Sequence, residues 1–204
     1  MYRRPKISGT EAEKWRSFHF ATRLKLEGAV YFCSRMLGAA SLPEDMGLSR
    51  LAHRQKKWYA EAFFFELCSA HDTLLQELNI IYGCNLDVDK VKWKNPKGKD
   101  IKSKLPESLA TKMQKGLDAD WFKKVRWYRN TATHHYLVPT EEGTVGWGTQ
   151  SWDAKVDGMK IVCIDEKTKK TIRENIEVCE DYLKNMLEHI HNVWSQMSQE
   201  FNKR

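Results

Sequence analysis

The stretch Ala62-Phe63-Phe64-Phe65-Glu66-Leu67-Cys68-Ser69-Ala70 decides the fold, because it is apolar on nearly every side of a helix. Such a run predicts a helix that is buried on several faces. It lies at the centre of a helical pattern that extends from Leu48 to Tyr82, where Gly83 provides a stop. This pattern is much longer than a strand, so we expect it to form the core of a helical protein.

Four further helices are predicted around this one. Thr10-Glu11-Ala12-Glu13 has the form of a capping box, and apolar residues at helical spacing follow it, which predicts a first helix over about residues 10–37. A short helix is expected over residues 106–115, and another begins at Asp118 or Asp120. Thr171-Ile172-Arg173-Glu174 has the form of a second capping box, so the last helix is expected to open there.

Residues 143–166 have the pattern of strands instead. Val145, Trp147 and the run Met159–Ile164 surround an Asp157-Gly158 turn signal, which predicts a β-hairpin. The predicted fold class is therefore all-α, an antiparallel helical bundle with a small β-hairpin insertion near residues 143–166. We expect one domain over residues 1–204, with the hairpin and a basic loop at residues 86–105 as insertions.

The composition favours a soluble protein that binds polyanions. The net charge is +7, and no apolar run is long enough to cross a bilayer, so a cytoplasmic protein without a membrane partner is expected. The five cysteines include no CxxC pair, which predicts neither a disulfide framework nor a zinc site. We expect no metal and no other cofactor.

Lysines concentrate in one segment. Residues 90–104 contain seven lysines and a single acid, Asp100. The segment can follow a phosphate backbone, with a tryptophan available for base stacking, or it can be a solvated, mobile loop without a ligand. The RNA-binding residues predicted by the first interpretation are Lys90, Lys92, Trp93, Lys94, Lys97 and Lys99.

The stretch Trp127-Tyr128-Arg129-Asn130-Thr131-Ala132-Thr133-His134-His135-Tyr136 combines groups suited to phosphodiester chemistry. A guanidinium that is always charged can stabilise a phosphate, and an imidazole with a pKa near neutrality can carry its proton. Pro139 cannot continue a helix, so His134 and His135 are expected near the end of one. We therefore predict RNA cleavage without a metal.

Arg129, Asn130 and His134 form an Arg-Asn-x-x-x-His sequence that resembles the signature of the HEPN superfamily, small α-helical proteins that include many ribonucleases. The resemblance implies that His134 acts as general base or acid, that Arg129 stabilises the phosphorane, and that Asn130 orients one of them. It also implies a homodimer whose two motifs share one cleft. Tyr136 completes a form similar to HEPN toxins whose tyrosine is modified by a partner nucleotidyltransferase antitoxin.

The sequence leaves several alternatives open. His135 rivals His134 as the catalytic histidine, since the family pattern also allows that spacing. Glu66 and Asp72 are candidates for catalytic support; Glu66 pairs with Arg129 or Arg126, or else lies on the wet edge of its helix.

The motif also has a purely structural interpretation, in which Arg129 pairs with a buried acid and Asn130 caps a turn. Another alternative is a catalytically silent HEPN-like module that binds RNA or a protein through the lysine segment, Trp93, Trp147 and Trp152.

Overall fold

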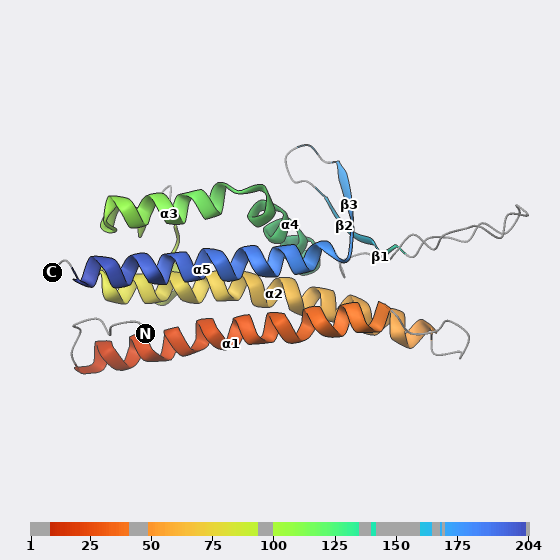
Figure 1. The fold of residues 1–204 in the computed structure, drawn as a ribbon, viewed down its shortest axis with the longest axis horizontal. Coiled ribbons are helices and arrows are strands. Elements are labelled where there is room, and N and C mark those ends of the chain that lie inside the picture. Colours follow the sequence, from red (N-terminus) through yellow and green to blue (C-terminus); the bar gives the residue numbers. More distant parts are fainter. Residues whose placement is uncertain are drawn as a thin grey trace, which may run out of the picture.

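The computed structural model describes residues 9–40, 49–93, 100–134, 140–141, 160–164, 168 and 170–202. Figure 1 shows three long helices side by side, α1 (Gly9–Ala40), α2 (Ser49–Ile81) and α5 (Val178–Asn202), with α1 running opposite to the other two. Two shorter helices, α3 (Glu107–Asp118) and α4 (Asp120–His134), pack on the side away from α1. The predicted antiparallel helical bundle is confirmed. No helix in the described part of the chain combines the length and apolar character needed to span a membrane.

The central run of α2 forms the core, as predicted. Phe63, Phe64 and Leu67 have no exposed surface, and the ring of Phe64 stacks on Tyr128 of α4 with ring centroids 4.6 Å apart. Phe65 is different, because 52% of it is exposed. Successive helical residues are rotated by about 100°, so the third phenylalanine emerges on the far side of the helix from the first. The run is therefore buried on several faces, as predicted, but not on the face of Phe65.

A buried carboxylate joins the three long helices. Glu77 of α2 is fully buried and accepts hydrogen bonds from Thr22 Oγ1 of α1 at 2.6 Å and from Trp194 Nε1 of α5 at 3.2 Å. The ring of His19 lies on it as well, with Nδ1 2.9 Å from Oε2. A carboxylate without partners would be costly at this depth, so this network fixes the register of α1 and α5 against α2.

A small antiparallel sheet precedes α5, with strand order β1 (Thr140–Glu141), β2 (Lys160–Ile164) and β3 (Thr171–Asn175). The predicted strand Met159–Ile164 is therefore confirmed as β2, with the strand beginning at Lys160. Its partners are Thr140–Glu141 on one side and Thr171–Asn175 on the other, so the sheet extends beyond the predicted boundaries of 143 and 166. Val145, Trp147 and the Asp157-Gly158 signal lie outside the described residues.

The second capping box was a wrong prediction. Thr171–Asn175 is β3, and α5 begins only at Val178. Exposed and partly buried residues alternate along β3, which places Ile172 and Glu174 on the inner face. Glu174 accepts hydrogen bonds from the hydroxyls of Tyr128 and Tyr182. Pairing with β2 satisfies the backbone here, so the stretch does not open a helix.

Candidate functional site

α4 carries the predicted motif on a helix with two distinct faces. Phe122, Val125 and Tyr128 recur every three residues and are buried against the other helices. Arg126 directly follows Val125, and Arg129 directly follows Tyr128, so the two arginine side chains lie on a neighbouring face of the helix. The amphipathic pattern of α4 thus presents two guanidinium groups toward α2.

Arg129 and Asn130 are hydrogen-bonded to each other. Arg129 Nη1 donates to Asn130 Oδ1 across 3.2 Å, and both side chains are half-buried. A bond of this kind limits the conformations of the guanidinium, so Asn130 contributes to fixing where Arg129 points.

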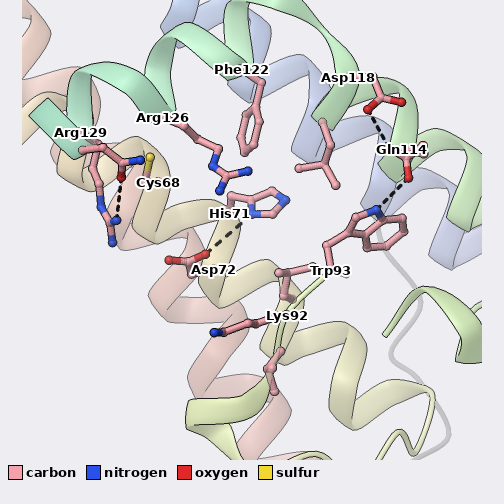
Figure 2. Close-up of a pocket in the computed structure, with 14 residues that line it drawn as sticks. Cys68, His71, Asp72, Lys92, Trp93, Gln114, Asp118, Phe122, Arg126 and Arg129 are labelled. Carbon is pink, nitrogen blue, oxygen red and sulfur yellow. Dashed lines mark hydrogen bonds and ion pairs between the residues drawn. The ribbon is translucent and has the colours of Figure 1, made fainter. Parts of the chain in front are cut away.

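A cavity of about 640 Å3 opens between α2 and α4 next to this pair. We call it the α2–α4 cavity. Figure 2 shows Arg126 extending from α4 toward the ring of His71, while Arg129 lies at the end of the cavity near Cys68. The polar groups on its walls include Arg126, Arg129 and Asn130 of α4, His71 and Asp72 of α2, and Lys92.

Trp93 and Gln114 shape the opposite end of the cavity from Arg129 (Figure 2). Trp93 Nε1 donates to Gln114 Oε1 at 3.0 Å, and Gln114 Nε2 donates to Asp118 Oδ1 at 2.8 Å. Only 8% of Trp93 is exposed, whereas the sequence suggested a tryptophan available for base stacking. The ring is held in the core, and its hydrogen bond fixes the wall of the cavity.

The lysines of this segment that the structure describes differ in their surroundings. Lys90 is exposed and forms an ion pair with Asp87. Lys92 is exposed and lines the α2–α4 cavity. Lys94, Lys97 and Lys99 lie within residues 94–99, which are outside the described part of the chain.

Cys68 lies in the wall of the α2–α4 cavity but is not suited to nucleophilic chemistry. Burial raises the pKa of its thiol to about 12, and the charge of Asp72 acts in the same direction, while Arg129 and Arg126 oppose the shift. The thiol therefore stays protonated at neutral pH, and a protonated thiol is a poor nucleophile.

A second hollow, of about 370 Å3, lies on the other side of Arg129. We call it the apolar hollow, because Phe32, Trp58, Ala62, Phe65 and Ala132 line it. More than half of Trp58 and of Phe65 is exposed, 54% and 52% respectively. Arg129 thus lies between a cavity lined by cations and a hollow lined by exposed aromatic rings.

Glu66 also lines the apolar hollow, but its ion pair differs from the prediction. Lys25 Nζ of α1 lies 3.1 Å from Glu66 Oε2, so the partner is a lysine of α1 and not Arg126 or Arg129. Gly28 explains how the helices come close enough: a Cβ at this position would lie 3.3 Å from Glu66 Cγ. Asp72 is mostly exposed and lies at the α2–α4 cavity, with Oδ1 3.9 Å from His71 Nδ1.

The remaining predicted residues lie at or beyond the end of α4. His134 is the last residue of the helix, and its side chain is outside the described part of the structure. His135 and Tyr136 lie outside the described residues.

The sequence did not indicate His71 and Arg126 as members of one site. Both are among the residues that line the α2–α4 cavity. The signal for His71 was a histidine directly after the apolar run Ala62–Ala70 and directly before Asp72. Within the described ranges, no group of three or more His, Cys, Asp or Glu side chains is placed to hold a metal ion.

Comparison with known proteins gives one match. The family model described as HEPN_Cthe2314-like HEPN matches residues 23–196, which include all of α2, α3 and α4 and most of α1 and α5. No curated protein and no solved structure matched the chain.

Proposed function

The chain belongs to the HEPN_Cthe2314-like HEPN family, and from this premise we propose that it is a metal-independent endoribonuclease that uses Arg129, Asn130 and His134. The observation that carries the proposal is the position of Arg129. It is hydrogen-bonded to Asn130, lies near the end of α4, and faces a cavity that Lys92 and Arg126 also line. This arrangement favours a negatively charged ligand at the motif.

The proposed reaction begins with the ribose 2′-hydroxyl of the RNA. His134 removes its proton, the 2′-oxygen bonds to the adjacent phosphorus, and the bond from phosphorus to the 5′-oxygen breaks as that oxygen receives a proton. The guanidinium of Arg129 stabilises the extra negative charge of the phosphorane. The products are a 2′,3′-cyclic phosphate and a 5′-hydroxyl. DNA has no 2′-hydroxyl and is therefore not a substrate.

The proposed assembly is a homodimer in which two motifs face one cleft. The apolar hollow supports this, because Trp58 and Phe65 expose large aromatic surfaces directly beside Arg129. His135 is the alternative to His134 as the catalytic histidine.

The biological role that we propose is that of a toxin or defence effector. The support is the sequence Arg129-x4-His134-x-Tyr136, whose tyrosine is the proposed target of a nucleotidyltransferase antitoxin. Addition of a nucleotide at Tyr136 would place a bulky anionic group two residues from His134 and block RNA entry.

The experiment compares purified wild type with Arg129→Ala and His134→Ala on total RNA and on single-stranded DNA, in buffer containing EDTA. We expect RNA alone to be cleaved, with 2′,3′-cyclic phosphate ends. Loss of a general acid or base lowers the rate by about 10²- to 10⁴-fold, and loss of a group that stabilises transition-state charge by about 10²- to 10³-fold, so both variants should be nearly inactive. Arg35→Ala and His191→Ala, which replace exposed residues of α1 and α5, are the matched controls and should cleave normally.

A catalytically silent RNA-binding module is the second candidate, and the exposed Lys92 at the cationic cavity favours it. Such a module binds RNA without cutting it. Binding would then weaken in Lys92→Glu and be unchanged in His134→Ala, whereas intact RNA with no binding at all would contradict both functions. The salt dependence of binding measures how many phosphates the cations neutralise.

A further inference from the structure

His71 borders the α2–α4 cavity with a buried imidazole ring. Its side chain is 7% exposed, and Nε2 is buried without a hydrogen-bond partner among the described residues. The imidazole is also one of the groups that line the cavity, where Figure 2 shows it across from Arg126. The ring of His71 thus borders the cavity, and its Nε2 is left without a hydrogen-bond partner by the described residues.

The neighbours of the ring do not account for this nitrogen. Asp72 Oδ1 lies 3.9 Å from the other ring nitrogen, Nδ1, which is too far for a hydrogen bond. Phe122 contacts the ring with centroids 4.9 Å apart, and the ring of His189 lies at 6.2 Å. These contacts need a flat ring but no polar atom. A phenylalanine would serve them without the cost of burying an unpaired nitrogen.

The cavity has the size and the charge of a site for a nucleotide. Its volume of about 640 Å3 is within the range of roughly 300–1,000 Å3 that small-molecule and cofactor sites occupy. Lys92, Arg126 and Arg129 supply three positive charges, against the two carboxylates Asp72 and Asp118. Arg126 and Arg129 belong to the helix of the motif and Lys92 is exposed, whereas His71 is buried. This division suits a phosphate at the cations and a base in the interior.

Resting on the function proposed above, we infer that the α2–α4 cavity receives one unpaired nucleotide of the RNA, next to the scissile bond at Arg129. Arg126 binds a phosphate of that nucleotide, and His71 Nε2 makes a hydrogen bond with the edge of its base. The nitrogen can donate or accept according to its tautomer, and the edges of all four bases carry suitable partners. A paired base cannot leave its stack without cost, so the substrate is single-stranded RNA or the loop of a folded RNA.

The test uses substrates that bind but cannot react. Short single-stranded oligonucleotides in which every 2′-hydroxyl is methylated lack the attacking group, and one base at a time is removed from them. Wild type should lose about tenfold in affinity when one particular base is absent, and little when any other is absent. In His71→Leu this penalty should vanish, because the group that reads the base is gone.

Two variants separate recognition from folding. His71→Gln places an amide nitrogen near the position of Nε2 and should restore part of the penalty. His189→Leu removes the neighbouring buried histidine, which does not line the cavity, and should keep the full penalty. Thermal melting of each variant shows whether the bundle is intact.

The outcomes distinguish the two proposals. Cleavage of natural RNA together with an equal affinity for every base-deleted oligonucleotide would overturn the cavity inference and leave the ribonuclease intact. A penalty that persists in His71→Leu would do the same. Oligonucleotides that fail to bind, together with natural RNA that is never cleaved, would overturn the proposed function and this inference with it.

Discussion

The packing of α3 on α5 depends on the absence of a side chain at Gly116. A Cβ built at this position would lie 2.2 Å from both Cε1 and Nδ1 of His189, whereas ordinary contacts are 3.4–4 Å. The ring cannot move away easily, because it is 8% exposed and lies between His71 and Trp121 at centroid distances of 6.2 and 6.3 Å. We therefore expect Gly116→Ala to destabilise the protein.

Two effects of opposite sign decide the size of this change. Alanine is favoured over glycine inside a helix by about 1 kcal/mol. Overpacking a filled interior costs about 1–3 kcal/mol or more, and an overlap this deep belongs to the upper part of that range. The expected net loss in the free energy of unfolding is therefore about 1–2 kcal/mol, or about 2–8 °C in Tm for a chain of this length.

Urea unfolding followed by circular dichroism measures this loss. Gly38→Ala is the matched control, because Gly38 also lies in a helix but nothing is within 4 Å of its added Cβ, so this variant should gain up to about 1 kcal/mol. In Gly116→Ala/His189→Ala the ring is gone, and the two losses should not add. A Gly116→Ala protein as stable as wild type would refute the packing argument.

Three other changes follow from buried groups. Burial, followed by the neighbouring His71, lowers the pKa of His189 from 6.5 to about 4, so the native state binds fewer protons than the unfolded chain. The free energy of unfolding measured in urea should therefore fall by about 3 kcal/mol as pH drops from 6.5 toward 4. His189→Phe should lose most of this pH dependence. Burial acts to raise the pKa of Glu174, but hydrogen bonds from Lys124, Tyr182 and Tyr128 outweigh it, so the pKa is lowered. The stability that the charged Glu174 contributes is therefore present above pH 4.5 and is lost as pH falls below that value. Glu174→Gln should reduce the free energy of unfolding at neutral pH in the same urea assay. Phe64→Ala should cost about 3–5 kcal/mol by calorimetry, whereas Phe65→Ala, at an exposed position, should cost less than about 1 kcal/mol.

The sequence predicted the helices well because helix formation leaves a local signal. The apolar period and the glycine stop placed the long core helix at 48–82, and α2 spans Ser49–Ile81. The prediction failed at Thr171–Glu174, where a capping signal of four residues competed with pairing to a strand several residues away. Satisfying five backbone positions against β2 is a non-local effect, and no local pattern reports it.

The buried acid of α2 shows the same limit. Glu66 and Asp72 were the predicted acids of interest because they interrupt apolar sequence. Among the described residues, however, it is Glu77 whose carboxylate has no exposed surface. The buried Glu77 carboxylate is stabilised by hydrogen bonds from Thr22 and Trp194, which are 55 and 117 residues away in the chain. The sequence contains all of these residues, but only the packing of three helices brings them together.

In the candidate site, too, some residues can be found from a local sequence motif and others only from the fold. Arg129 and Asn130 are adjacent, so a short motif was enough to select them, and the structure adds their hydrogen bond. His71 comes to the same cavity from α2, more than fifty residues earlier, and only the packing of α2 against α4 reveals it. Arg129 in turn borders two hollows of different character. Cations beside it favour a polyanion, while exposed aromatic rings on its other side favour a protein surface. A residue that had only to pair with a buried acid would need neither neighbour, so the two hollows support the proposal that Arg129 binds a ligand.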